Sequence, residues 1–362
     1  MSKNIVVCCD GTGNEFGDEN SNVVKLYGTL VIDGIQQVGY YHPGVGTMGA
    51  PTATNKLTKA WSILTGLAFG AGLIGNVSDA YRYLMNSYAD GDRIYIFGFS
   101  RGAYTARALA GVIHMFGLLC PGNDALIPYV IRDFARRSRA AGGMAHTLQV
   151  AEGFKATFSR QCPLHFVGVW DTVSSVGWVW DPVKLPYTAR NPSMLTGRHA
   201  ISIDERRCYY RNNLWGDAFE DQDIKQIWFS GVHSDVGGSY SESESGLSKI
   251  ALAWMLQEAQ NAGLVTDPKT VARVLGNAPP PPPVAPDPLA IIHKSLQGAW
   301  WLLEVLPHSY YDSVTRKKRW RIPLGAYRAI PEGSVLHSSV KTRLDAGIGY
   351  RPKNLPEQYN YD

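Results

Sequence analysis

The stretch that most constrains the fold is RIYIFGFSRGAYTARALAG, residues 93–111. It begins with an apolar run typical of a buried strand and ends with the small and apolar residues of a helix. Gly-Phe-Ser-Arg-Gly joins the two. A Gly-x-Ser-x-Gly sequence in this context is typical of the nucleophile elbow, a strained strand-to-helix turn whose glycines let the backbone pass closely beneath an exposed serine. We therefore predict that Ser100 is a nucleophile.

Strand and helix patterns alternate along the rest of the chain. Short apolar runs bounded by Gly, Asp or Ser predict parallel strands that are buried on both faces. These runs are residues 5–9, 93–97, 164–169 and 226–230. Helical patterns occupy residues 79–88, 103–116 and 126–139. The alternation predicts an α/β fold with a doubly wound, mostly parallel sheet and helices on both faces.

We expect one large catalytic domain followed by a smaller C-terminal part. The catalytic domain is predicted over residues 1–277, and the proline-rich 278–288 is predicted to be a linker or surface loop. In residues 289–362 we expect an amphipathic helix, in HKSLQGAWWLLEVLP, followed by loops that wrap over the surface of the same domain.

Composition and charge argue against several classes of function. The 35 basic and 31 acidic residues give a net charge of only +4, and they are spread along the chain, so we expect no nucleic-acid partner. The five cysteines have no metal-binding spacing, and we expect them to be reduced core residues. We therefore predict no catalytic metal and no cofactor, with a structural calcium ion near the acidic EFGDEN, residues 15–20, left open. Oligomeric state is left open.

Two stretches of the sequence bear on where in the cell the protein is expected. The start of the chain, MSKNIVVCCDG, lacks the features of a signal peptide, so we expect a cytoplasmic protein, with export by a signal-less secretion system left open. The apolar stretch 61–77 is too short and too rich in glycine for a membrane span, and it is interpreted as a buried or covering helix.

A nucleophilic serine needs a base to take its proton and an acid to orient that base. In a parallel α/β sheet both come from loops at the carboxyl ends of later strands, in the order Ser, Asp, His. Asp171 directly follows one predicted strand, and His233 directly follows the next. We predict a triad of Ser100, Asp171 and His233. Asp171 could instead cap a helix, with Asp235 as the acid, and His337 is the alternative base.

Seven ordered blocks carry a family resemblance. They are CCDGTGN, YYHPGVGT, AFGAGL, GDRIYIFGFSRGAYTARALAG, FVGVWDTVSSVG, DERR and IWFSGVHSDVGGSY. Together they resemble the α/β-hydrolase family whose best-known members are the catalytic domains of Tle1-type phospholipase effectors of type VI secretion. The resemblance implies a serine enzyme that cleaves carboxylic esters through Ser100, with Asp171 and His233 as acid and base.

The substrate implied by the resemblance is a small-molecule or lipid ester, with phospholipid acyl esters included and peripheral membrane contact possible in principle. The alternative from another class is a hydrolase-like module that binds or assembles without catalysis. One of two apolar segments, residues 60–75 or 298–307, is predicted to cover the site as a lid. The competing interpretation is that both are plain core helices.

The first strand ends in VVCCDGTGN, where Asp-Gly-Thr could also indicate a haloacid-dehalogenase-like phosphatase. Such an enzyme carries its nucleophilic aspartate two residues earlier, where this chain has Cys8. We instead predict that the turn forms part of an oxyanion hole, with backbone donors at Gly11, Thr12 and Arg101. Asp10 is expected to hold the turn by accepting backbone hydrogen bonds.

Overall fold

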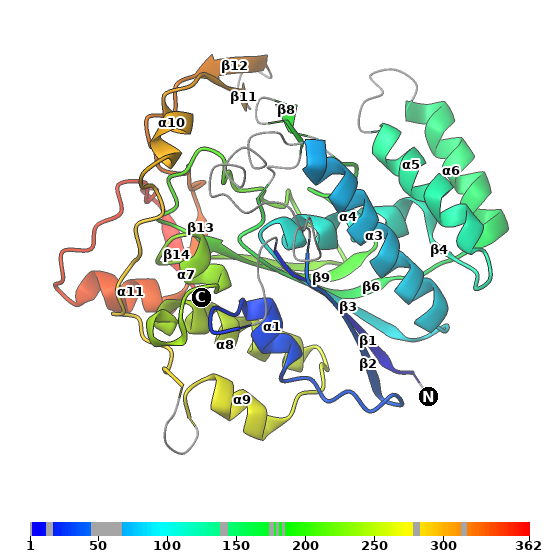
Figure 1. Ribbon diagram of the computed structural model, residues 1–362, viewed down its shortest axis with the longest axis horizontal. Coiled ribbons are helices and arrows are strands. Elements are labelled where there is room, and N and C mark those ends of the chain that lie inside the picture. The colour runs from blue at the N-terminus through cyan, green and yellow to red at the C-terminus, as the bar shows by residue number, and fades with distance from the viewer. Residues whose placement is uncertain are drawn as a thin grey trace, which may run out of the picture.

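The computed structural model describes residues 2–11, 17–44, 67–137, 144–173, 177–178, 181–182, 185–277, 283–312 and 317–362 (Figure 1). Its centre is an eight-stranded sheet in the order β14-β13-β10-β9-β6-β3-β1-β2, and every neighbouring pair in it is parallel. The strands of this sheet are β1 (Asn4–Cys9), β2 (Gln37–His42), β3 (Arg93–Phe99), β6 (Leu164–Trp170), β9 (Met194–Ser202), β10 (Asp223–Phe229), β13 (Ser334–Leu336) and β14 (Tyr359–Tyr361).

Helices and short hairpins surround the sheet. The helices are α1 (Asn22–Tyr27), α3 (Leu67–Ser87), α4 (Arg101–Phe116), α5 (Ile127–Arg137), α6 (Met144–Phe158), α7 (His233–Gly237), α8 (Gly246–Asn261), α9 (Pro268–Val274), α10 (Trp300–Glu304) and α11 (Ser338–Asp345). Single 3₁₀ turns occur at η1 (Asp124–Leu126) and η2 (Glu242–Glu244). Three two-stranded sheets are formed by β4 (Leu118–Leu119) with β5 (Ser159–Arg160), β7 (Gly177–Trp178) with β8 (Asp181–Pro182), and β11 (His308–Asp312) with β12 (Lys317–Arg321).

Side chains of β1 show why helices cover both faces of the sheet. Successive residues of a strand point to opposite faces. Ile5 and Val7 lie in a core cluster with residues of α3, α4 and α5, whereas Val6 and Cys8 lie in a second cluster with residues of α1 and α8. All four side chains are fully buried. The predicted doubly wound α/β fold is therefore confirmed.

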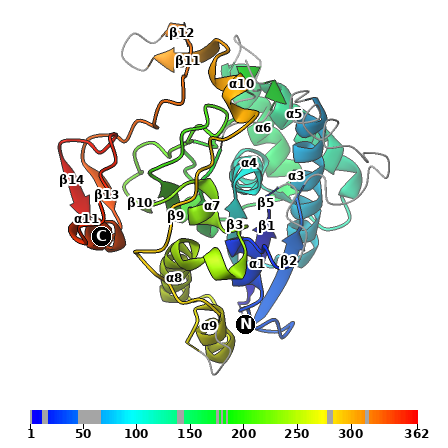
Figure 2. The ribbon, with the colours of Figure 1, turned by 60° about the vertical axis from the view of Figure 1, so that its left-hand side comes forward.

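The carboxyl ends of the parallel strands position the candidate site. Strands β3, β6, β9 and β10 are consecutive neighbours in the middle of the sheet. Ser100 and Asp171 directly follow β3 and β6, and His233 lies in the loop-to-helix segment just after β10. Because these strands run the same way, their ends share one edge of the sheet, below α10 and the β11–β12 hairpin in Figure 2. The register therefore brings residues far apart in sequence to one place.

The C-terminal part differs from the sequence-based expectation. The predicted loops wrapped on the surface include β13 and β14, which extend the main sheet beyond β10. Each of these strands has three residues, too few for a readable alternation of apolar and polar side chains. The expectation of surface loops is therefore wrong for these residues.

The amphipathic helix expected in residues 293–307 is present but much shorter than expected, because α10 spans only Trp300–Glu304. His293 and Ser295 instead hydrogen-bond the buried carboxylates of Asp235 and Glu205. These contacts hold the chain before α10 in a non-helical path, and a positive φ of 54° at Gly298 precedes the helix.

The apolar stretch at 61–77 falls partly within α3. Residues 67–77 form the first half of that helix, with Leu73 and Val77 buried in the core, and residues 61–66 lie outside the described part of the chain. Over the residues that the structure describes, no helix combines the length and the apolar character needed to cross a membrane. The cysteines are free thiols; Cys8, Cys9 and Cys162 are buried, while Cys120 and Cys208 are half-buried.

Candidate active site

Ser100 occupies a strained turn between β3 and α4. Its φ of 60° and ψ of −120° lie outside the regions that a side chain ordinarily allows. Its backbone N–H donates to Trp170 O at 3.1 Å, which ties the turn to the end of β6. The motif's glycines are required by close contact, since a Cβ on Gly98 would lie 2.5 Å from Gly102 O and one on Gly102 would clash with Cys9 O. This is the geometry expected of a nucleophile elbow.

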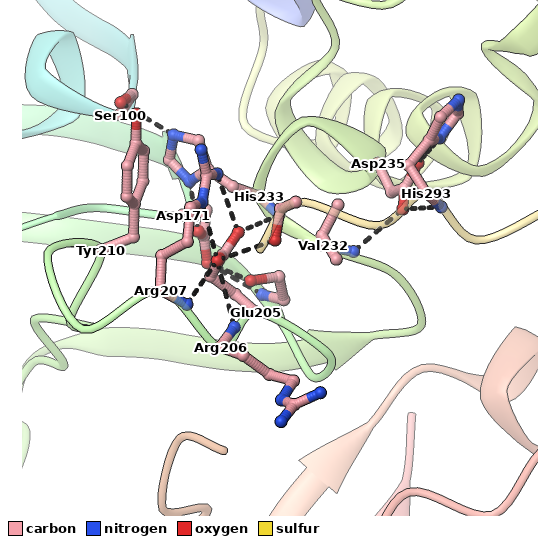
Figure 3. A network of polar contacts seen from close by, with 12 residues as sticks. Ser100, Asp171, Glu205, Arg206, Arg207, Tyr210, Val232, His233, Asp235 and His293 are labelled. Atoms are coloured by element: carbon pink, nitrogen blue, oxygen red, sulfur yellow. Dashed lines mark hydrogen bonds and ion pairs between the residues drawn. The ribbon is translucent and has the colours of Figure 1, made fainter. Parts of the chain in front are cut away.

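His233 connects the serine to the aspartate. Its Nε2 lies 2.8 Å from Ser100 Oγ, and its Nδ1 lies 2.5 Å from Asp171 Oδ2 (Figure 3). The imidazole also contacts the rings of Phe99 and Tyr210, each with a centroid separation of 4.7 Å. All three polar side chains are at least nine-tenths buried. The structure thus brings the three predicted residues together in one chain of hydrogen bonds.

Asp171 receives donors on both carboxylate oxygens. Oδ1 accepts from the Ser202 N–H at 2.9 Å, from Ser202 Oγ at 3.0 Å and from Arg328 Nη1 at 2.6 Å. Oδ2 accepts from Arg328 Nη2 at 3.0 Å and pairs with His233. Burial by itself would raise the pKa of Asp171, but the Arg328 guanidinium and the hydrogen bond to His233 hold that pKa well below its usual range. The carboxylate is therefore ionised at neutral pH.

The environment of His233 favours the neutral imidazole. Burial lowers the pKa of His233 below its ordinary value, while Asp171 opposes the shift and Arg207 adds to it. A neutral ring whose Nδ1 donates to Asp171 leaves Nε2 as an acceptor for the Ser100 hydroxyl proton. This arrangement can transfer a proton from Ser100 to His233.

The two rival residues make their contacts elsewhere. Asp235 accepts from the Val232 N–H at 2.9 Å and pairs with His293 Nδ1 at 2.6 Å, on the far side of Val232 from the Ser100 hydroxyl in Figure 3. His337 is the N-cap of α11, where its Nδ1 accepts from the Ser339 N–H at 3.2 Å. His233 is the histidine within hydrogen-bond reach of Ser100, and its other ring nitrogen meets Asp171.

Asp10 organises the end of β1. Its Oδ1 accepts from the Gly11 N–H at 2.6 Å, and its Oδ2 accepts from Ser21 Oγ at 2.7 Å and Tyr41 Oη at 2.8 Å. The expected backbone donor is present and is joined by two hydroxyl donors. Thr12 lies outside the described residues.

The β1 turn lies against the turn at Ser100. The clash that any Gly102 side chain would make is with the carbonyls of Cys9 and Asp10, so α4 begins directly beside this turn. Arg101 is the first residue of α4, and its backbone amide therefore belongs to the helix N-terminus immediately after Ser100. An oxyanion hole from Arg101, Gly11 and Thr12 remains a prediction. Because the Gly11 N–H donates to Asp10 Oδ1, Gly11 could serve as an oxyanion donor only by sharing that N–H or giving up this bond.

Glu205 is a buried residue of the site that sequence reasoning did not single out. It accepts from the His233 N–H at 3.2 Å, from Arg207 Nη2 at 2.9 Å and from Ser295 Oγ at 2.9 Å. Burial opposes ionisation, yet Arg207 lowers the pKa of Glu205 to about 2. The carboxylate therefore anchors the backbone of His233. Its only sequence signal was the DERR block that contributed to the family resemblance.

Aromatic rings and an arginine continue from His233 toward α10. The guanidinium of Arg207 lies 3.7 Å from the ring centroid of Tyr210 and 5.0 Å from that of Trp300. The rings of Tyr210 and Trp300 are themselves 5.5 Å apart. These edge-to-face ring contacts connect Trp300, the first residue of α10, with the His233 imidazole through the single intervening ring of Tyr210.

Within the described ranges, no three His, Cys, Asp or Glu side chains lie close enough together to hold a metal ion. The hydrogen-bonded residues at the site, namely serine, histidine, aspartate and glutamate with two arginines, are instead those of acid–base and nucleophilic chemistry.

Residues 3–258 match the family model described as the catalytic domain of Tle1-like phospholipase effectors of type VI secretion systems. An uncharacterised protein of Saccharomyces cerevisiae is 37% identical over 216 residues, which cover 57% of this chain and 31% of that protein. The chain thus spans less than a third of the length of this curated relative.

Two solved structures are similar at low identity. An uncharacterised protein from Pseudomonas aeruginosa has a TM-score of 0.41 and 21% identity, covering 75% of this chain and 48% of that one. A Tle1 effector bound to the VgrG spike of the type VI secretion system has a TM-score of 0.38 and 18% identity, covering 68% of this chain and 53% of that one.

Proposed function

The chain belongs to the family of Tle1-like catalytic domains of type VI secretion phospholipase effectors, and from this premise we propose that it is a serine hydrolase of carboxylic esters. The observation that carries the proposal is the hydrogen-bonded chain from Ser100 Oγ through His233 to Asp171. Family membership on its own indicates lipase or esterase chemistry without naming the residues. The geometry supports this particular assignment of nucleophile, base and acid.

In the proposed mechanism, Ser100 Oγ attacks the ester carbonyl carbon while His233 Nε2 takes the hydroxyl proton. Asp171 holds the ring orientation and stabilises the imidazolium. The tetrahedral oxyanion is stabilised by the amide at the start of α4 together with donors of the β1 turn. His233 then returns its proton to the departing alcohol, which leaves an acyl group on Ser100. A water then attacks the acyl carbonyl carbon while His233 takes one of its protons. The bond to Ser100 Oγ breaks, the acid leaves, and His233 returns the proton to Ser100 Oγ.

We propose lipid acyl esters as the substrate class, in keeping with the family. The apolar surface beside the site supports this proposal. Around α10 the exposed side chains include Trp301, Leu302 and Val305, with Leu302 68% exposed. Trp300 is one ring removed from His233. We therefore propose that α10 is the lid and meets the lipid surface. The other lid segment, 60–75, lies largely outside the described residues.

A fluorophosphonate probe tests the proposal directly, because it labels only an activated serine. Wild-type protein is expected to be labelled at Ser100 and to hydrolyse members of a panel of soluble, micellar and phospholipid esters. A folded wild type that neither reacts with the probe nor hydrolyses any ester would favour the non-catalytic binding module instead.

Replacing Trp300 and Trp301 with serine should reduce hydrolysis of long-chain esters about tenfold relative to short-chain esters. The reason is the loss of apolar and ring contacts on the path to His233, at about 1.5 kcal/mol or more. Rates on acetyl and decanoyl esters, below and above micelle formation, measure the effect. Trp320→Ser, at a 60% exposed position on β12, is the matched control. Unfolding of the double variant would support a core role for α10.

Gly11→Val should lower turnover by about a hundredfold or more while leaving Ser100 in place, because a β-branched side chain would displace the β1 turn from the oxyanion. Gly44 packs closely against this turn, since a Cβ on Gly44 would lie 2.5 Å from Gly11 O. Single-turnover acylation rates give the readout. Gly17→Val is the matched control, because a Cβ there meets nothing within 4 Å. Equal activity of both variants would contradict the assignment of Gly11.

A further inference from the structure

Arg328 reaches the candidate active site from outside the region that the family model matches. That region ends at residue 258, whereas Arg328 follows the β11–β12 hairpin. Its side chain is buried, and each of its three guanidinium nitrogens donates a hydrogen bond. The acceptors are both oxygens of Asp171, the hydroxyl of Ser202 at 2.7 Å and the carbonyl of Tyr210 at 3.0 Å. The triad aspartate therefore sits between two nitrogen donors, His233 and Arg328.

We propose that Arg328 is a positioning residue of the hydrolytic centre, which fixes the Asp171 carboxylate and compensates its negative charge. This inference rests on the proposed function and extends it, since it makes the C-terminal segment part of the site. A two-pronged contact of Arg with a carboxylate fixes both the plane and the direction of the carboxylate. The orientation of the imidazole is set in turn by Asp171 Oδ2.

The charge of Arg328 has a second consequence. A buried carboxylate without a cation tends to take up a proton, and a protonated Asp171 could not hold His233 in the required tautomer. Arg328 keeps Asp171 ionised. The positive charge of Arg328 also opposes protonation of the Asp171–His233 pair as a whole. His233 therefore stays unprotonated, and able to act as a base, down to a lower pH.

Other groups around the pair contribute to the same balance. Arg207 opposes protonation of His233, whereas Glu205, whose carboxylate meets the His233 N–H, favours it. On β9, His199 accepts from the Thr172 N–H, and burial lowers the pKa of His199 to about 3, so it is uncharged at neutral pH. Arg101 at the start of α4 faces Tyr209 and Tyr210. Arg328 donates directly to both oxygens of the Asp171 carboxylate.

The competing interpretation is that Arg328 only anchors the C-terminal segment to the sheet, through Tyr210 O and Ser202. Both interpretations predict a loss of stability when the side chain is removed. They differ in the pH dependence, because an anchor has no effect on the proton affinity of the Asp171–His233 pair.

The test compares Arg328→Met, which removes the positive charge, with Arg328→Lys, which keeps the charge but loses the two-pronged contact with the Asp171 carboxylate. In the pH profile of kcat/KM, Arg328→Met should move the acidic limb to higher pH by about one unit or more. The reason is that the Asp171–His233 pair then binds a proton more readily. Arg328→Lys should keep the limb near the wild-type position with a lower kcat. Ser202→Ala, which removes a neutral donor from the same carboxylate oxygen, should move the limb by much less than Arg328→Met does.

Titration of the His233 ring protons by NMR gives the same comparison without any turnover. An upward shift in Arg328→Met but not in Arg328→Lys supports the inference even if no ester is hydrolysed, in which case only the proposed function fails. If Arg328→Met does not fold, Arg328→Gln provides the uncharged variant. A folded uncharged variant with a wild-type acid limb and a wild-type His233 titration would overturn the inference and leave Arg328 as an anchor.

Discussion

Ser100→Ala is expected to abolish ester hydrolysis, with kcat falling by about 10⁴-fold or more, while the protein stays folded. The substitution removes only the hydroxyl that His233 Nε2 meets at 2.8 Å, and it removes no apolar contact from the core. The backbone strain at φ 60° is the same in both proteins, because alanine and serine carry the same Cβ. Hydrolysis rates, probe labelling and thermal unfolding of the two proteins measure the outcome.

Ser248→Ala is the matched control for this change. Ser248 is a buried serine on α8, and its hydroxyl donates to Ser245 O at 3.0 Å, so its loss tests the cost of removing any buried hydroxyl. We expect it to retain full activity. Persistence of hydrolysis in Ser100→Ala, combined with magnesium dependence and inactivation by Asp10→Ala, would instead support phosphatase-like chemistry at the β1 turn.

His233→Ala should be nearly as damaging as the loss of Ser100, with kcat again lower by about 10⁴-fold, because residues that act as a unit fail together. Without the imidazole no base meets the Ser100 hydroxyl, and Asp171 is left with Arg328 and Ser202 as partners. Steady-state hydrolysis at several pH values is the measurement.

Two other histidines serve as controls for His233. His293 is paired with the buried Asp235, so His293→Ala reproduces the structural cost of leaving a buried carboxylate without its histidine. His337→Ala removes the alternative base, which caps α11 and lies against the ring of Phe229 at 4.7 Å. Both variants should remain active. If His337→Ala is inactive and His233→Ala keeps most of its activity, the base has been assigned to the wrong residue.

The two aspartate–histidine pairs show what a strand-end position can and cannot indicate. Asp171 and Asp235 both follow strands of the same sheet, and both are bonded to a histidine in the structure. Asp235 is the closer of the two to His233 along the chain, yet its carboxylate bonds His293 instead. Distance along the chain therefore says little about which carboxylate orients the base.

Local sequence patterns were sufficient to predict the central sheet of this protein and the turn that carries Ser100. The apolar strand, the Gly-x-Ser-x-Gly turn and the small-residue helix are contiguous, so the turn at Ser100 and the parallel sheet could be predicted from the sequence. The positions of Asp171 and His233 could also be predicted, since Asp171 directly follows β6 and His233 lies shortly after β10. The expected doubly wound fold is confirmed, because the alternation of buried strands with helices is a repeated local signal.

Tertiary structure alone decided which distant groups complete the site. Glu205, Arg328 and Trp300 approach His233 or its partners through contacts between segments far apart in the chain. From the sequence alone, a charged residue such as Arg328 is predicted to lie on the solvated surface. The strands β13 and β14 have only three residues each, too few for a pattern that predicts a strand. Burial of Arg328 becomes favourable only when Asp171, Ser202 and Tyr210 already surround its position, and no local property of the sequence records that.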